Sequence, residues 1–219
     1  MEKILRKIIW AFIAAPAVYL SIVWKSIPDS VPLHFRLNGD IDKYGTKNEL
    51  ILAVLLLIAF SIIVYLLLPL VYRIDPKKPA ADNKAKLYRI AFCISVFISA
   101  VSCLLIYSIV TGDIQFGTRF IMAGAGLMIA MAGNYIYTIK PNYFAGIRLP
   151  WTLRNDENWK KTHLLAGKLF FSGGIIIAIV SLFTSLIASI IVLFAVMLVV
   201  ATIISVYSYR LYKKLQTQV

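Results

Sequence analysis

Charged residues are scarce in this sequence, and so are the residues that most often carry catalysis or bind metals. Only 15% of the 219 residues are Asp, Glu, Lys or Arg, and there are two histidines and two cysteines. The chain has no Cys/His spacing typical of a metal site, no glycine-rich phosphate loop and no paired nucleophile and base. Cys93 and Cys103 lie about 15 Å apart along a helix and therefore cannot form a disulfide with each other. We expect a protein that is not an enzyme and holds no metal or cofactor.

Apolar residues are correspondingly abundant, at 60% of the chain. Ordinary soluble domains are nearer half apolar, so the excess must face something other than water. Six runs lack charge for about the length of helix that crosses the hydrocarbon core of a bilayer. They cover residues 8–24, 50–71, 90–110, 120–137, 169–182 and 186–208. The sequence predicts an all-α integral membrane protein with six transmembrane helices.

The cationic residues are divided unevenly between the two sides of this predicted bundle. The side that holds both termini, the second loop and the fourth loop carries 18 of the 23 Lys and Arg residues. The other side carries Lys25, Arg36, Lys43, Lys47 and Arg119, nearly balanced by acidic residues. Because cationic loops stay in the cytoplasm, we expect both termini there. This distribution explains the net charge of +13 without a nucleic-acid partner.

The N-terminus allows a second interpretation. Basic residues at positions 3, 6 and 7, followed by a short apolar run, also resemble a signal peptide, with Ala15-Pro16-Ala17 as a poor cleavage site. We favour a first transmembrane helix in which Pro16 introduces a kink.

Two regions follow from this division. Residues 1–71 form a helical pair with an external loop at 25–49, and residues 72–219 form a four-helix region with a cytoplasmic loop at 138–164. The fourth predicted helix is rich in small residues. Gly126, Ala130 and Asn134 are spaced by four, so that one face lets a neighbouring backbone come close. We expect a central packing helix, with a dimer interface as the alternative.

The external loop has the pattern of a short hairpin lying on the membrane surface. Apolar residues 33, 35 and 37 alternate with His34 and Arg36, and the turn dipeptide Asn38-Gly39 follows. Residues 46–49 read as a capping box that opens the second helix. His34, Asp40 and Asp42 could coordinate zinc or manganese. We favour hydrogen bonds and charge pairs among these groups instead.

The cytoplasmic loop is interrupted by Pro141 and Pro150, which end any long helix there. Trp151 and Trp159 suit the headgroup layer, so we expect the segment to lie along the membrane interface. Asn155 or Asp156 is a good N-cap for a helix that runs into the fifth span. An acid–base or anion-binding group could in principle form from His163, Arg148, Asp156 and Glu157. We favour a structural role, in which these residues pin the loop to the helix ends and to lipid phosphates.

Two motifs resemble a known bacterial family. The external motif consists of Pro32, His34, Phe35, Asn38, Gly39, Asp42, Gly45 and Lys47. It resembles a domain of unknown function that often accompanies the SdpI-type immunity proteins. The cytoplasmic motif consists of Asn142, Gly146, Arg148, Pro150, Trp151, Thr152, Trp159, Thr162, His163 and Gly167. It resembles the signature of the SdpI-type immunity proteins themselves.

This resemblance implies a multi-pass protein of the bacterial cytoplasmic membrane. The family's namesake protects a producing cell from a secreted toxic peptide and signals its presence by holding a transcriptional repressor at the membrane. The resemblance therefore implies three partners: the lipid bilayer, a secreted toxic peptide and a cytoplasmic repressor, with no direct contact to nucleic acid. The alternatives are a transporter of a small solute or lipid, or a membrane enzyme acting on lipid headgroups. The absence of acidic residues from the six spans speaks against ion-coupled transport.

Overall fold

A computed structural model gives the fold and describes residues 2–36, 41–76 and 82–217. Six helices of the described chain are long and apolar enough to cross a membrane. They are α1 (Glu2–Val23), α2 (Lys47–Leu67), α3 (Lys84–Thr111), α4 (Ile114–Ile136), α6 (Asp156–Phe183) and α7 (Leu186–Gln216). The shorter elements are η1 (Trp24–Ser26), β1 (Ser30–Phe35), β2 (Ile41–Thr46), η2 (Leu68–Arg73) and α5 (Pro150–Arg154). The six helices expected from the apolar runs are all present.

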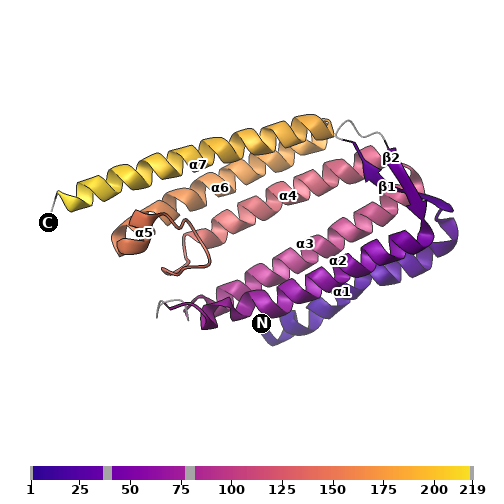
Figure 1. Cartoon of the computed structure of the whole chain (residues 1–219), viewed down its shortest axis with the longest axis horizontal. Helices are drawn as coiled ribbons and strands as arrows, with labels where there is room; N and C mark the ends of the chain where they lie inside the picture. The colour runs from indigo at the N-terminus through magenta and orange to yellow at the C-terminus, as the bar shows by residue number, and fades with distance from the viewer. Residues whose placement is uncertain (1, 37–40, 77–81, 218–219) are drawn as a thin grey trace.

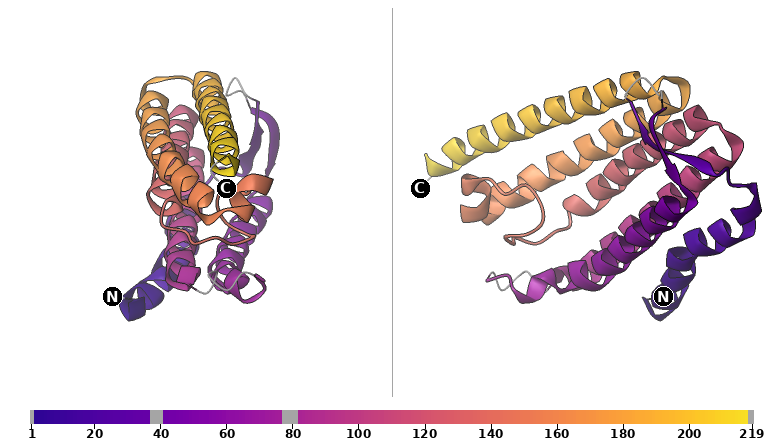
Figure 2. Two further views of the ribbon diagram at one scale, coloured as in Figure 1. Left: turned by 90° about the vertical axis from the view of Figure 1, so that its left-hand side faces the viewer. Right: turned by 45° about the vertical axis from the view of Figure 1, so that its right-hand side comes forward.

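The helices form two layers (Figure 1). We call α1, α2 and α3 the N-terminal half and α4, α6 and α7 the C-terminal half. The hairpin of β1 and β2 lies at one end of the bundle, together with the turn between α6 and α7 (Figures 1 and 2). The connection between α4 and α6, which contains α5, lies at the opposite end with the C-terminus. The two sequence motifs are therefore separated by the length of the bundle.

Side-chain caps fix where several helices begin. Thr46 and Glu49 form the expected capping box at α2: the Thr46 hydroxyl accepts from the Glu49 amide, and a Glu49 carboxylate oxygen accepts from the Thr46 amide at 2.7 Å. At α4, an oxygen of Asp113 accepts from the Phe116 amide at 2.9 Å. α4 therefore begins six residues before the predicted charge-free span, which starts after Arg119, because the cap residue determines where the helix begins.

In the C-terminal half, α4 and α6 pack backbone against backbone. A Cβ on Gly126 would lie 2.5 Å from the Ala178 nitrogen, and one on Gly133 would lie 2.5 Å from the Phe171 nitrogen. Neither position leaves room for any side chain, so the expected packing role of this face is confirmed. Asn134 does not belong to it, because its side chain is exposed and Gly133 takes that place. We call the contact the α4–α6 seam, formed by Gly126, Ala130, Gly133, Gly167 and Gly174.

The N-terminal half is held by apolar packing and by one pair of serines. Ile9 and Ile13 of α1 are buried in a cluster with Tyr65 of α2. Ser61 and Ser95 each donate a hydrogen bond to the other's carbonyl oxygen, which joins α2 to α3 inside the bundle. The first helix thus packs as a full member of the bundle.

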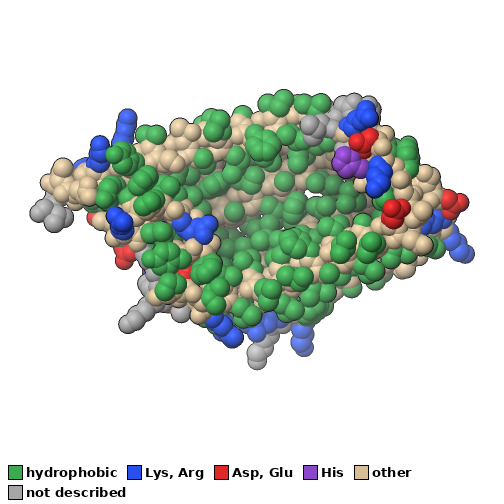
Figure 3. Space-filling view, in the orientation of Figure 1, with side chains coloured by type: hydrophobic (Ala, Val, Ile, Leu, Met, Phe, Trp, Pro, Cys, Tyr) green, Lys and Arg blue, Asp and Glu red, His purple; other side chains and the backbone are tan. Residues whose placement is uncertain are grey.

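On the face shown in Figure 3, an apolar belt lies between the charged ends of the molecule. On α7, the side chains of Phe194 and Leu198 are 68% and 70% exposed. Water would make such exposure costly along a whole helix, whereas lipid makes it favourable. The belt is therefore the lipid-facing surface of the bundle.

Candidate functional site

The hairpin of β1 and β2 is anchored to the bundle through β1. Its strands are antiparallel, with Ser30 opposite Thr46 and Phe35 opposite Ile41. Val31 is fully buried in a cluster that includes Leu20 of α1 and residues of α2 and α3. The expected hairpin is thus present and fastened to the bundle. Its predicted turn at Asn38 and Gly39 lies outside the described residues.

The polar residues of the hairpin contact one another. His34 Nδ1 lies 2.6 Å from an Asp42 carboxylate oxygen, and Arg36 Nε lies 3.8 Å from the other oxygen. The hydrogen bond from His34, assisted by the charge of Arg36, holds the pKa of Asp42 below its ordinary value. These contacts agree with the hydrogen-bonded arrangement favoured above. Asp40, the third residue of the alternative metal site, lies outside the described residues.

The remaining motif residues of the hairpin fix its shape. A Cβ on Gly45 would collide with the side chains of Leu33 and Glu49, which would have to move to make room for it. Pro32 pairs with Tyr44 across the strands. Lys47, at the start of α2, forms an ion pair with Asp29 at 3.0 Å. Phe35 is the last residue of β1.

A small cavity lies directly beneath the hairpin. Its volume is about 110 Å³, and β1, α2, α3 and α4 all contribute to its wall. The lining is mostly apolar, including Pro32, Leu33 and Ile121, and it contains Ser108 of α3. The Ser108 hydroxyl is buried and has no hydrogen-bond partner within the described chain. The hydroxyl packs against Gly117 of α4, where an added Cβ would collide with it, so a ligand group could bond this oxygen only where that contact gives way.

At the opposite end, Asn142 shapes the first turn of the cytoplasmic motif. Its side-chain oxygen accepts from the amides of Phe144 and Ala145, at 2.8 and 2.6 Å. Its side-chain nitrogen donates to the carbonyl oxygens of Lys140 and Ala145, both at 2.9 Å. Asn142 is buried, so each of these bonds forms away from water. The Asn142 side chain therefore holds the backbone of this turn in its conformation.

His163 closes the loop onto α6. Its Nε2 accepts from the Ile147 amide at 2.9 Å, so Nδ1 carries the proton and donates to the Trp159 carbonyl oxygen at 2.8 Å. Gly146 has a φ of 104°, and a Cβ on it would collide with the imidazole. His163 has no exposed surface. Both ring nitrogens are committed inside the protein, which is a structural role rather than that of an acid or base.

Trp159 corrects one sequence-based expectation. It is only 2% exposed, its indole nitrogen donates to the Ile139 carbonyl oxygen at 2.9 Å, and its ring stacks on His163 at 4.0 Å. The ring therefore packs against protein and not against lipid headgroups. Of the two tryptophans in this motif, Trp159 is enclosed and Trp151 keeps a partly exposed side chain.

The short helix α5 is fixed from both sides. Pro150 begins it, and the buried Thr152 hydroxyl donates to the Ile147 carbonyl oxygen at 2.7 Å and accepts from the Leu149 amide at 3.0 Å. The Trp151 indole nitrogen donates to the Ser208 hydroxyl of α7 at 3.0 Å. The loop is thereby attached to the last helix as well as to α6.

Two buried residues of α6 complete these links. Asn158 donates to the Ser208 carbonyl oxygen at 2.9 Å, and Thr162 donates to the Asn158 side-chain oxygen at 3.0 Å. Asn155 is the N-cap that the sequence suggested, since its side chain accepts from the Asn158 amide at 2.8 Å. Gly167 lies in the α4–α6 seam, against the Gly133 carbonyl oxygen.

Two residues that sequence reasoning missed join the loop to the N-terminal half. Asn83, just before α3, accepts from the Lys140 amide at 2.9 Å and donates to its carbonyl oxygen at 3.2 Å. Asp75 accepts from the Tyr143 amide at 2.7 Å. Nothing local in the sequence indicates these contacts, because the partners are more than fifty residues apart.

Arg148 is exposed, unlike every other residue of the cytoplasmic motif except Pro150. One nitrogen of its guanidinium donates to the Tyr143 carbonyl oxygen at 2.8 Å. Beside it on the same turn, Phe144 is 43% exposed. The loop therefore presents Arg148 close in sequence to two exposed aromatic rings, Tyr143 and Phe144.

The comparisons with known proteins fit both loops. Residues 138–208 match the model of the SdpI/YfhL protein family, and residues 11–59 match a domain of unknown function (DUF1648). The first match covers the cytoplasmic motif, and the second covers the hairpin. The chain is 30% identical, over 197 residues, to the immunity protein SdpI of Bacillus subtilis strain 168, with 89% of each chain covered. No solved structure matches. With six apolar helices and a relative of this identity along nearly its whole length, the chain is a multi-pass membrane protein that belongs to the SdpI/YfhL family.

Proposed function

We propose that this protein protects a bacterial cell against a secreted toxic peptide and that it is not an enzyme. The observation that carries the proposal is the 30% identity to an immunity protein across 89% of both chains, which includes both motif loops. The geometry supports a non-catalytic role, because the polar atoms of Asn142, Thr152 and His163 are used in hydrogen bonds within the loop.

The proposed orientation places the hairpin outside the cytoplasmic membrane and both termini in the cytoplasm. The excess of Lys and Arg at the end with the termini supports it. The orientation can be tested with two single-cysteine variants, Lys43→Cys and Lys214→Cys. Each is made in a background in which Cys93 and Cys103 are replaced by Ala. A membrane-impermeant maleimide should label the cysteine at position 43 in intact cells and the one at 214 only after lysis. The reverse pattern would refute the orientation.

The cavity beneath the hairpin is the proposed contact for the peptide. Its apolar wall suits an apolar side chain, and the unpartnered Ser108 hydroxyl can bond a polar atom beside that side chain. The volume of about 110 Å³ matches one side chain rather than a drug-sized ligand.

The test is survival of a sensitive bacterial strain challenged with the secreted peptide of the native locus. Wild-type protein should raise the lethal concentration relative to an empty vector, and Ser108→Ala should lower it about two- to tenfold, the effect of one hydrogen bond. Ser102→Ala is the matched control, since Ser102 bonds only the Ile98 carbonyl oxygen of its own helix. Equal killing with and without wild-type protein would refute immunity. A silent Ser108→Ala would refute the cavity as the contact.

A signalling role is the second candidate, in which the cytoplasmic loop recruits a soluble transcriptional repressor. The exposed Phe144 and Arg148, on the turn held by Asn142, support it. Arg148→Ala should then release the repressor from isolated membranes while leaving resistance to the peptide unchanged.

A further inference from the structure

A cavity of about 520 Å³ lies at the end of the bundle opposite the hairpin, between the start of α3, the end of α4 and the start of α6. Its wall contains Asp82, residues 137–141, Asp156, Trp159 and Lys160. The volume is within the range of about 300–1,000 Å³ that sites for small ligands occupy. We call this site the loop cavity.

Hydrogen bonds between distant segments fix the wall of the loop cavity. The Asn83 side chain bonds both backbone groups of Lys140, which places the neighbouring Asp82 beside the end of α4. The nearly buried Trp159 donates from its indole nitrogen to the Ile139 carbonyl oxygen at 2.9 Å. The backbone around the cavity is therefore held in place by the protein itself, which lowers the cost of ordering it around a ligand.

Side chains of both charges line the loop cavity. All four are exposed, and they comprise two carboxylates and two ammonium groups: Asp82, Asp156, Lys140 and Lys160. Asp156 and Lys160 lie one turn apart on α6 but do not form an ion pair with each other, whereas Glu157 and Lys161 beside them do, at 2.6 Å. A cavity with charges of both signs favours a ligand that carries both a cation and an anion.

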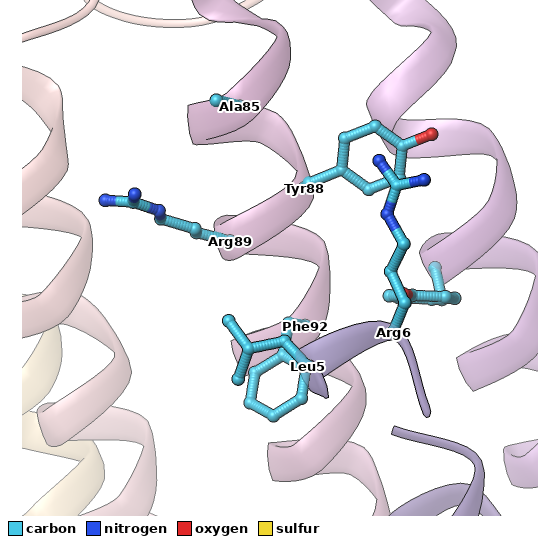
Figure 4. A pocket seen from close by; sticks show the side chains of 7 residues that line it. Leu5, Arg6, Ala85, Tyr88, Arg89 and Phe92 are labelled. Carbon is cyan, nitrogen blue, oxygen red and sulfur yellow. The ribbon is translucent and has the colours of Figure 1, made fainter. Parts of the chain in front are cut away.

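The arginines near the starts of α1 and α3 do not form a comparable site. The Arg6 guanidinium lies 4.7 Å from the centre of the Tyr88 ring, and Arg89 points to the opposite side of α3 (Figure 4). The cleft beside them has a volume of about 20 Å³, which holds about one water molecule. The loop cavity, in contrast, has room for a lipid headgroup.

The position of the loop cavity along α6 matches the headgroup layer of a bilayer. Lys160 and Phe183 lie about 35 Å apart along this helix, whereas the hydrocarbon core of a bilayer is about 30 Å thick. With Phe183 at one boundary of the core, Lys160 lies just beyond the other. One turn further into the membrane, Leu164 is 50% exposed, so the lipid-facing surface begins directly below the cavity.

We propose that the loop cavity binds the zwitterionic headgroup of phosphatidylethanolamine. The ammonium group of the lipid donates to Asp82 and Asp156. Its phosphate accepts from Lys140 and Lys160, and the first carbons of an acyl chain lie on Leu164. Phosphatidylcholine also carries both charges, but its quaternary nitrogen has no N–H to donate. The proposal does not depend on the proposed immunity function or on which leaflet faces this end.

Native mass spectrometry of the delipidated protein in detergent tests the site. The probes are phosphatidylethanolamine and phosphatidylcholine with identical acyl chains, and the readout is the ratio of the two bound lipids. Wild-type protein should favour phosphatidylethanolamine about tenfold, about threefold for each carboxylate that accepts a hydrogen bond. The double variant Asp82→Asn/Asp156→Asn should bring the ratio close to one. A wild-type protein without this preference, or a variant that keeps it, would overturn the proposal.

Two further arms separate this site from general charge and from soluble ligands. The control Asp29→Asn/Glu157→Gln also removes two carboxylates, but both lie outside the cavity wall, so the ratio should stay within about twofold of the wild type. An equal loss in this control would overturn the assignment to the cavity. Phosphoethanolamine, the soluble headgroup, should not displace the lipid at equal concentration, because it lacks the acyl chains. Displacement would overturn the assignment of a lipid as the ligand.

Discussion

Replacing His163 with alanine should destabilise the protein strongly, although the residue lies in the motif of a loop. The substitution leaves the Ile147 amide without its acceptor, which costs about 1–3 kcal/mol in a buried site. It also empties the space of a ring stacked on Trp159, for a further cost of about 2–3 kcal/mol. Together these effects amount to about 3–6 kcal/mol, or a fall in melting temperature of about 6–24 °C for a chain of this size.

The assay is the fraction of protein that remains monodisperse in detergent after heating. His163→Phe fills the space and keeps the stacking but lacks the acceptor, so it should show only the hydrogen-bond part, about 1–3 kcal/mol. His34→Ala, on the exposed hairpin, is the control and should change stability by about 0.5 kcal/mol or less. If His163→Ala melts within about 2 °C of the wild type, the structural role assigned to this histidine is wrong.

Two further predictions concern the seam and the hairpin. Gly174→Ala should abolish most folded protein in a size-exclusion assay, because a Cβ there collides with the Ala130 backbone. In the control Gly173→Ala, the Cβ collides only with the end of a valine side chain, so this variant should lose about 1 kcal/mol of stability or less. Equal yields of the two variants would refute the backbone contact. The pKa of Asp42 is lowered by its bond from His34, so this contact is present above the ordinary carboxyl value of 3.8 and is lost as the pH falls through the lowered pKa. In acid, hydrogen exchange of the hairpin amides should therefore become faster relative to the amides of a control helix. Asp42→Asn should remove this acid dependence. An unchanged acid dependence in the variant would contradict the assigned role of the His34–Asp42 contact.

The local features of this fold could be predicted from sequence, since each depends on residues close together in the chain. The capping box at Thr46 and Glu49, the cap at Asn155 and the strands on either side of the external turn all belong to this class. The six helices follow from the length of the apolar runs, although the start of α4 required its cap residue, Asp113.

The missed features depend on what lies across the bundle. A tryptophan near a predicted helix end is read as interfacial, and only the packed structure shows that Trp159 is enclosed and bonded to Ile139. The Asn83 contact with Lys140 is likewise invisible to any pattern of spacing. The family resemblance named the residues of the cytoplasmic motif, whereas their mutual hydrogen bonds could be seen only in the fold.

The α4–α6 seam has a mechanical consequence for communication between the two ends of the molecule. Two backbones in direct contact cannot slide past each other without forcing peptide groups together, so α4 and α6 move as one rigid strut. Between α3 and α4 the contact includes side chains, such as Phe97 against Gly124, which can repack. A displacement imposed at the hairpin end would thus be transmitted to the cytoplasmic loop as a tilt of the whole strut, with the α3–α4 contact as its pivot.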